Sequence, residues 1–221
     1  MTTVTFDLFS ALIDSRTGGS AAFRRLARGR GWPVTGQQLY DSWDPNNKAA
    51  QRDCSTWVPW REPATTALSR AYDELGLDGD AAADVEVLVD SMSGWPLWPD
   101  VAAGLSRVAV HHRVGLLSNV DDELFARTAA APLVDPEVAL TSQRLRAYKP
   151  HPEIYLRALE AFGPVVHVAT SARDVRGALE AGIPVVRLRR PGHELDPGGP
   201  RPAYEVGTLD DLPGALAHLV A

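Results

Sequence analysis

The chain has 221 residues, 45% of them hydrophobic, so it is long enough for one large domain or a core domain with a smaller insert. Its formal net charge of −6, and the lack of a basic strip interleaved with aromatic residues, argue against nucleic acid as a partner. The one cysteine, Cys54, excludes an internal disulfide and a zinc site built from cysteines.

Membrane and secretion signals are also missing from the sequence. No apolar run approaches the roughly 20 residues that cross a membrane. The N-terminus has no basic region followed by an apolar stretch. We therefore expect a cytoplasmic globular protein that does not bind a membrane.

The first apolar run, Val4–Phe6, predicts a buried strand that ends in Asp7. Residues 16–94 then predict only helices, and the flanking stretches rich in small residues or proline predict hinges at 15–20 and 93–100. The predicted helices, the first with Ser20 as its N-cap, are Ser20–Arg30, Val34–Asn47, Glu62–Leu75 and Gly79–Met92.

From residue 101 onward, short valine-rich runs alternate with helical patterns, which predicts an α/β fold with a parallel, doubly wound sheet. The predicted strands are Val114–Leu117, Val138–Leu140, Val165–Ala169, Val185–Leu188 and the edge strand Tyr204–Val206. The predicted helices are Val101–Val110, Glu153–Phe162 and Leu209–Val220. We expect residues 1–15 and 95–221 to form a core domain and residues 16–94 a helical cap domain over the carboxyl edge of its sheet.

Polar residues stand at the predicted strand ends or open the segments that follow: Asp7, Ser118 with Asn119, Lys149 and Asp174. Alone, each has a structural explanation as a helix cap, a turn residue or a surface residue. Together they would converge on one edge of the sheet. There Asp7 can act as a carboxylate nucleophile oriented by Lys149, while Ser118 and Asn119 donate hydrogen bonds to the substrate. Asp174 can hold the lysine or a metal, or position water.

These residues lie in four stretches that resemble the motifs of the haloacid dehalogenase (HAD) superfamily. The stretches are "FDLFSALID", "LLSN", "YKPHPEIY" and "HVATSARDVRGALEAGIP", and the resemblance covers about residues 1–15 and 96–190. It implies a HAD-type Rossmann-like core with a helical C1 cap inserted after the first strand. It also implies that Asp7, Ser118, Lys149 and Asp174 are catalytic.

Phe9 separates two branches of that superfamily. HAD phosphatases carry an aspartate at this position as a general acid and base, and phenylalanine cannot shuttle a proton. An aromatic residue here resembles the L-2-haloacid dehalogenases, which release halide from a small 2-haloacid through an aspartyl ester and need no metal or other cofactor. The alternatives are a phosphatase with Mg²⁺ on Asp7 and Asp174, acting on an unusual phosphate, and a non-catalytic HAD-fold binding protein.

The dehalogenase resemblance implies a small-molecule substrate and allows a homodimer, since such proteins are often dimers. The chain departs from the pattern at Ala11, Ala169 and Ser171, and it has Asp44 where a halide-binding arginine commonly follows a tryptophan. Lys48 or Arg52 is a candidate substitute for that arginine. The expected substrate-binding residues are Phe9, Ser10, Asn119, Tyr155, Ser171, Trp43 and Lys48.

Overall fold

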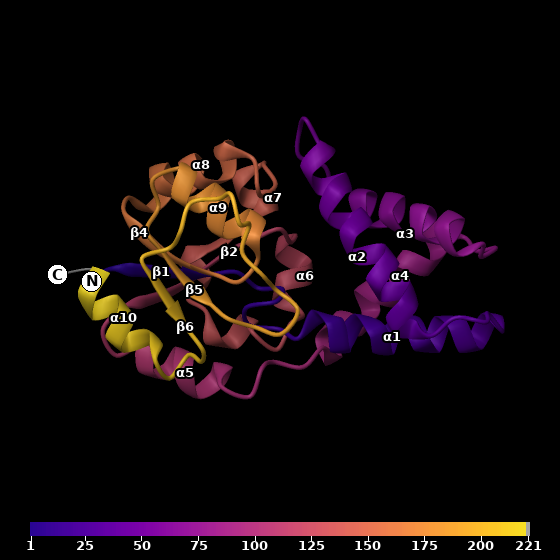
Figure 1. Ribbon diagram of the computed structural model, residues 1–221, viewed down its shortest axis with the longest axis horizontal. Helices are drawn as coiled ribbons and strands as arrows, with labels where there is room; N and C mark the ends of the chain where they lie inside the picture. Colours follow the sequence, from indigo (N-terminus) through magenta and orange to yellow (C-terminus); the bar gives the residue numbers. More distant parts are fainter. Residues whose placement is uncertain (220–221) are drawn as a thin grey trace.

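A parallel sheet forms the centre of the larger lobe in the computed structural model, which describes residues 1–219 (Figure 1). Its strand order is β3-β2-β1-β4-β5-β6, and every neighbouring pair is parallel. Both faces are covered, so the strand residues are almost all buried, as their valine-rich runs predict. The strands are β1 (Thr3–Phe6), β2 (Arg113–Ser118), β3 (Ala139–Thr141), β4 (Val165–Ala169), β5 (Val185–Leu188) and β6 (Tyr204–Val206).

Helices cover the two faces of this sheet as separate groups (Figure 1). On one face α5 (Val101–Val108) packs beside α10 (Leu212–Leu219), and on the other α8 (Pro152–Phe162) packs beside α9 (Ala172–Glu180). Shorter helices follow the strands: α6 (Asp122–Ala126), α7 (Ser142–Leu145) and the 3₁₀ turns η2 (Ala131–Leu133) and η3 (Pro136–Val138). The predicted α/β, doubly wound fold is confirmed. Val220, the predicted end of the last helix, lies outside the described residues.

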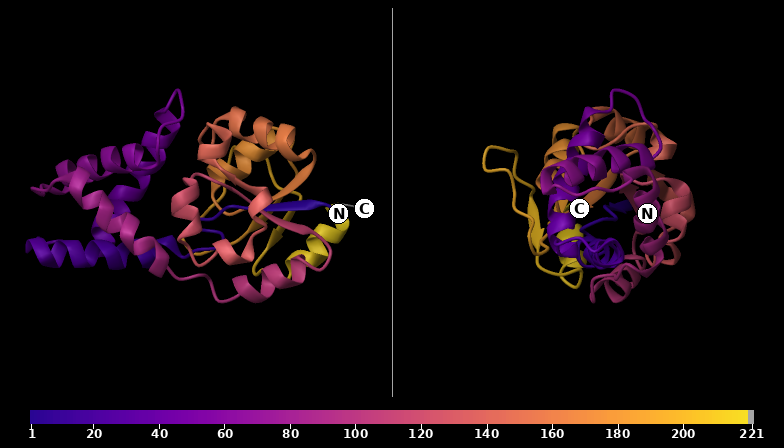
Figure 2. Two further views of the ribbon diagram at one scale, coloured as in Figure 1. Left: turned by 180° about the vertical axis from the view of Figure 1, so that it is seen from behind. Right: turned by 90° about the vertical axis from the view of Figure 1, so that its right-hand side faces the viewer.

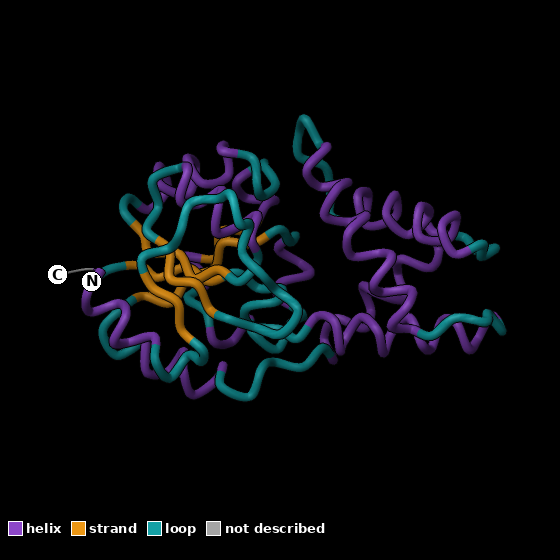
Figure 3. Tube along the Cα trace, in the orientation of Figure 1, coloured by secondary structure: helices purple, strands orange, loops and turns teal. Residues whose placement is uncertain are grey.

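Four helices between β1 and α5 form a second lobe (Figures 2 and 3). Apolar side chains from each of them, including Phe23, Leu39, Leu68 and Leu88, are fully buried and belong to one hydrophobic cluster. The helices are α1 (Ser15–Arg30), α2 (Gly36–Asp53), α3 (Arg61–Leu75) and α4 (Ala81–Ser91), followed by the 3₁₀ turn η1 (Met92–Gly94). No helix among residues 1–219 is both long and apolar enough to cross a membrane.

The hinge predicted at 15–20 is wrong, because these residues form the first turns of α1. The helix is capped by Asp14, whose side chain accepts a hydrogen bond from the Thr17 amide, and Ser20 lies inside it. Gly18 and Gly19 are buried in this segment. Both glycines serve close packing rather than a hinge, since a Cβ on either would overlap an aromatic ring.

Helix α2 extends six residues beyond the predicted end at Asn47. A capping box between Thr35 and Gln38 starts the helix, and it continues past Pro45 to Asp53. The extension matters for the site because it carries Lys48 and Gln51 toward the sheet lobe, where both line a cavity.

Candidate active site

The carboxyl ends of β1, β2 and β4 meet beneath the helical lobe, and a cavity partly open to solvent lies there. Asp7 directly follows β1, Ser118 ends β2, and Asp174 lies in the first turn of α9. The residues that line the cavity come from both lobes: Asp7, Phe9, Ser10, Ser15, Tyr40, Trp43, Asp44, Asn47, Lys48, Gln51, Trp60, Trp95, Ser118, Asn119, Lys149, Ser171, Arg173 and Asp174.

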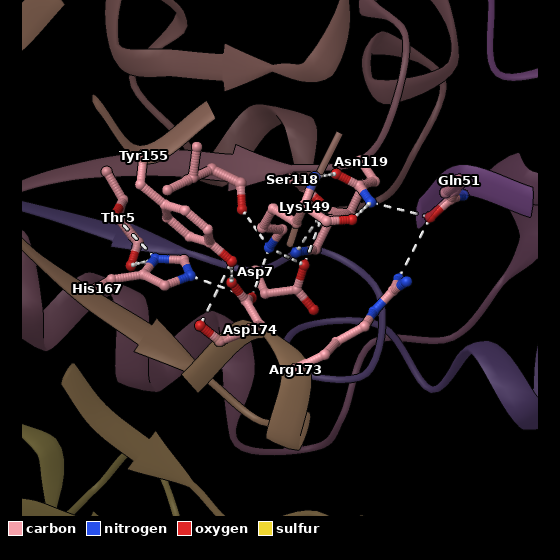
Figure 4. Close-up of polar contacts among 12 residues, drawn as sticks. Thr5, Asp7, Gln51, Ser118, Asn119, Lys149, Tyr155, His167, Arg173 and Asp174 are labelled. Atoms are coloured by element: carbon pink, nitrogen blue, oxygen red, sulfur yellow. Dashed lines mark hydrogen bonds and ion pairs between the residues drawn. The ribbon is translucent and has the colours of Figure 1, made fainter. Parts of the chain in front are cut away.

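Lys149 joins the two carboxylates of the site (Figure 4). Its ammonium donates to Asp7 Oδ1 at 2.8 Å, to Asp174 Oδ2 at 2.5 Å and to the Leu117 carbonyl at 2.8 Å. An ammonium has three protons, so this geometry uses all of them. Because Lys149 is almost fully buried, it is held in place by charge as well as by packing.

The two oxygens of Asp7 have different environments. Oδ1 accepts from Lys149 and from the Ser118 hydroxyl at 3.1 Å, and that hydroxyl in turn accepts from the Leu8 amide at 3.3 Å. Oδ2 has no hydrogen-bond partner among residues 1–219, although Asp7 lines the cavity. The carboxylate is therefore anchored through one oxygen and presents the other to a ligand.

Both carboxylate oxygens of Asp174 have hydrogen-bond partners. Its Oδ1 accepts from the Tyr155 hydroxyl at 2.9 Å, and its Oδ2 accepts from Lys149 and lies 3.1 Å from His167 Nε2. Burial alone would raise the pKa of Asp174, but Lys149 and His167 outweigh burial and lower it below its usual range. The side chain is thus an ionised anchor for Lys149 with little capacity left to bind water or a metal.

His167 is a contributor that the sequence pattern did not indicate, because it stands inside a buried strand. Its Nδ1 lies 3.0 Å from the Thr5 hydroxyl and 3.1 Å from the Thr5 carbonyl. The Nε2 atom faces a carboxylate oxygen, so that nitrogen must carry a proton. His167 therefore connects β1 to Asp174 through the interior of the sheet.

Asn119 supports Lys149 more than it faces a ligand. Its Oδ1 accepts from the Lys149 amide at 2.7 Å, and its Nδ2 donates to the Lys149 carbonyl and to Gln51 Oε1, each at 2.9 Å. Although Asn119 lines the cavity, its amide is fully engaged. Gln51, which reasoning from the sequence missed, ties this arrangement to α2 of the helical lobe.

Of the other predicted substrate-binding residues, all but Tyr155 line the cavity. Phe9, Ser10, Trp43, Lys48 and Ser171 line the cavity, and Lys48 forms an ion pair with Asp44 at 2.5 Å.

Tyr155 is fully buried, lies outside the cavity lining and contacts Asp174 instead. Burial, followed by the charge of Asp174, raises the pKa of the Tyr155 hydroxyl, which keeps it protonated as a donor. Arg52, the other candidate for the missing arginine, is exposed and pairs with Asp53.

A magnesium ion does not fit this set of donors. Mg²⁺ requires several oxygen ligands in octahedral geometry, usually carboxylates. Here the Lys149 ammonium lies between Asp7 and Asp174, and both Asp174 oxygens are already occupied. Residues 1–219 also contain no group of three or more His, Cys, Asp or Glu side chains that could hold a metal ion.

Comparison with known proteins identifies the family of this chain. A family model for haloacid dehalogenase-like hydrolases matches residues 1–182. The chain belongs to this family. It is therefore a haloacid dehalogenase-like hydrolase.

Curated relatives of this haloacid dehalogenase-like hydrolase fall into two groups. It is 25% identical to haloacetate dehalogenase H-2 of Moraxella sp. (strain B), over 99% of this chain and 97% of that one. It is 30% identical to (S)-2-haloacid dehalogenase 4A of Burkholderia cepacia, over 97% and 91%. A phosphoglycolate phosphatase of Photorhabdus laumondii is 25% identical over 84% and 79%.

Among solved structures, the L-2-haloacid dehalogenase of Xanthobacter autotrophicus with chloropropionic acid covalently bound superposes with a TM-score of 0.82. The sequence identity is 20%, and the match covers 98% of each chain. At this identity the similarity shows that the fold, including the helical lobe, is shared.

Proposed function

We propose that this hydrolase releases halide from small 2-haloacids through an ester on Asp7. The observation that carries the proposal is the asymmetry of the Asp7 carboxylate. Oδ1 is fixed by Lys149 and Ser118, while Oδ2 is unpartnered in residues 1–219 on a cavity wall. A nucleophile held in one orientation before the substrate arrives requires little reorganisation to attack.

In the first step Asp7 Oδ2 attacks the carbon that bears the halogen. The new oxygen–carbon bond forms as the carbon–halogen bond breaks, and the halide leaves with the bonding electron pair. No proton is needed, so Phe9 in place of an acid does not impede the step. The apolar rings of Phe9, Trp43 and Trp95 line the cavity and suit a carbon–halogen group.

In the second step water attacks the ester carbonyl. After attack through Oδ2, the carbonyl oxygen is Oδ1, which already accepts from Lys149 and Ser118. These donors stabilise the negative charge that develops on Oδ1 in the tetrahedral intermediate. Its collapse releases a 2-hydroxy acid and a proton, and Asp7 keeps one oxygen from water.

Within residues 1–219 the site lacks two features that the alternative function, a phosphatase, requires: a general acid and a binding site for Mg²⁺. The ring of Phe9 cannot protonate a departing alcohol, and the donor set does not fit Mg²⁺. Asp174 is consequently assigned to positioning Lys149. We also propose that residues 16–94 act as a cap domain on a core made of residues 1–15 and 95–221.

A substrate panel separates the candidates. Purified protein would be incubated with 2-chloropropionate, chloroacetate and a set of phosphate monoesters, each with EDTA or with Mg²⁺, while halide and phosphate are measured. The dehalogenase proposal predicts halide release that EDTA does not reduce. Phosphate release that requires Mg²⁺, without halide release, would instead favour the phosphatase, and no product from either set would favour a binding protein.

A further inference from the structure

We propose that Arg173 is the residue that anchors the carboxylate of the substrate. The inference rests on the proposed function for the reaction, but it adds how a short carboxylic acid is recognised. It assigns this role to a core helix, whereas Lys48 and Arg52, the candidates from the sequence for a halide-binding cation, lie on helix α2 of the helical lobe.

The side chain of Arg173 crosses from the core to the helical lobe. It starts in the first turn of α9, next to Asp174, and reaches α2, where it donates to the Lys48 carbonyl at 3.2 Å and to Gln51 Oε1 at 3.3 Å. In Figure 4 Asp7 is drawn between the His167–Asp174 group on one side and Arg173 on the other. Both Asp7 and Arg173 line the same cavity.

These two contacts leave several N–H donors of Arg173 without a hydrogen-bond acceptor elsewhere in residues 1–219. A guanidinium has five N–H donors, and the two bonds that it makes are long and go to neutral oxygens. The carboxylates of the cavity lining are all paired with lysines: Asp44 with Lys48, and Asp7 and Asp174 with Lys149. A partly buried guanidinium without a carboxylate partner favours binding an anion from solution.

The other cations of the cavity wall are already committed. Within residues 1–219 the lining contains Lys48, Lys149 and Arg173. Lys48 pairs with Asp44, and Lys149 uses its protons on Asp7, Asp174 and a backbone carbonyl. Arg173 is thus the lining cation, in the described part of the chain, that has no carboxylate partner.

Burial affects the pKa of Arg173 but does not remove the charge of its guanidinium. Burial lowers the pKa of the guanidinium, whereas the charges of Asp174, Asp7 and Asp44 act in the opposite direction. A guanidinium stays protonated at neutral pH in either case. An incoming carboxylate would therefore meet a permanent positive charge on the wall of the cavity that Asp7 also lines.

The position also fits the geometry of the substrate class. In a 2-haloacid the carbon under attack is bonded directly to the carboxylate, so the anchor must lie beside the nucleophile. The fork of a guanidinium can bind both carboxylate oxygens and so fix the orientation of that carbon. The aromatic wall then receives the halogen and the alkyl group.

The test compares a carboxylate with its uncharged amide. Turnover of chloroacetate and of chloroacetamide would be measured for the wild type, Arg173→Gln and Arg173→Lys, with Arg176→Gln as the control. Arg176 lies on the same helix but is exposed and pairs with Glu180 and Asp196. We expect kcat/KM for chloroacetate to fall about 10- to 100-fold in Arg173→Gln, and that for chloroacetamide to change far less.

Arg173→Lys keeps the charge but loses the fork, so we expect an intermediate loss, and thermal unfolding of each variant would verify folding. If Arg173 only linked the two lobes, both substrates would be affected equally, and the proposal would be overturned. The same would follow if Arg176→Gln lost as much discrimination as Arg173→Gln.

Binding separates this inference from the proposed reaction. Propionate and propionamide, which carry no leaving group, would be titrated into the same proteins by NMR. Binding of propionate that depends on Arg173, without halide release from any substrate, would support the anchor and contradict the dehalogenase function. Halide release with propionate binding unaffected by Arg173→Gln would contradict the anchor alone, and the absence of both would contradict both.

Discussion

The two oxygens of Asp7 differ in what holds them, and this difference determines how the site can react. Substitution by asparagine keeps the shape of the side chain but removes the oxygen that we propose as the nucleophile. We predict that Asp7→Asn lowers the rate of halide release by more than about 1,000-fold.

Steady-state kinetics with 2-chloropropionate measures the effect of that substitution. Asp41→Asn is the matched control, because Asp41 is exposed on α2, pairs with Arg16 and lies outside the lining of the cavity. Substantial turnover by a folded Asp7→Asn protein would assign the chemistry to another group.

Asp174 links the site to the stability of the fold. Its pKa is lower in the folded protein than in the unfolded chain, so the ionised form favours folding above the unfolded pKa of about 3.9. This advantage is lost as the pH falls toward the folded pKa. Asp174→Asn cannot titrate, and at pH 7 it leaves Lys149 with one carboxylate instead of two.

We therefore predict that Asp174→Asn is less stable than the wild type by about 3 kcal/mol at neutral pH, and that the difference shrinks below about pH 4. Urea unfolding at pH 7 and pH 3 measures both quantities. The exposed residue Asp53 supplies the control, Asp53→Asn. A difference that stayed constant across this range would contradict the assigned role.

Part of the site could be predicted from the order of residues at strand ends. Asp7, Ser118, Lys149 and Asp174 stand at or after those ends, and parallel strands bring such positions to one edge. Arg173 lies beside Asp174 in the same stretch, but nothing local shows that its side chain reaches α2.

Two other residues of the site, His167 and Gln51, could not be predicted for similar reasons. His167 reads as one more residue of a buried strand, and Gln51 lies beyond the predicted end of α2. Their contacts depend on how the two lobes meet, which a pattern of spacing does not contain.

At the scale of elements, the glycines of α1 show how packing overrides propensity. A Cβ on Gly18 would overlap the indole of Trp95, whereas a Cβ on Gly29 of the same helix would meet nothing within 4 Å. We predict that Gly18→Ala destabilises the protein by about 1–3 kcal/mol, because the well-packed interior cannot move aside cheaply.

Gly29→Ala is the matched control and should stabilise the fold by up to about 1 kcal/mol, because alanine is the better helix former. Thermal unfolding of both variants measures these opposite effects. Equal stabilisation by the two substitutions would show that Gly18 marks a flexible segment after all.

The contrast between local propensity and tertiary packing also explains which strands and helices could be predicted. All six predicted strands are present, and each begins and ends within one residue of its predicted position, because valine-rich runs between helical segments have few other interpretations. The sequence predicts that the first helix begins at Ser20, because serine is a good N-cap and the preceding stretch of small residues is typical of a hinge. Only the tertiary position of Trp95 and Tyr40 explains why glycine is needed there.

At the scale of the whole molecule, polar contacts connect the helical lobe to the core around the cavity. Gln51 accepts from Asn119 and Arg173, the Trp60 amide donates to Asp121 at 3.0 Å, and Tyr148 donates to the Val58 carbonyl. Gln51 lines the same cavity as Asp7. Its loss should loosen the end of α2 more than it destabilises the fold.

We predict that Gln51→Ala speeds amide hydrogen exchange near the carboxyl end of α2 and lowers the unfolding free energy by only about 1–2 kcal/mol. Hydrogen-exchange mass spectrometry reports the first effect, and urea unfolding reports the second. Gln37→Ala is the control, since Gln37 is exposed on the same helix. Unchanged exchange in Gln51→Ala would show that this link does not hold the lobes together.

The central claim is that a covalent ester forms on Asp7, and isotope labelling tests it most directly. The protein would turn over 2-chloropropionate in ¹⁸O-water with enzyme in excess, and the peptide that contains Asp7 would then be weighed by mass spectrometry. We predict ¹⁸O in Asp7 and unlabelled oxygen in the 2-hydroxy acid of the first turnover. Turnover that labels only the product and leaves Asp7 unlabelled would contradict the account, because water would then have attacked the substrate directly.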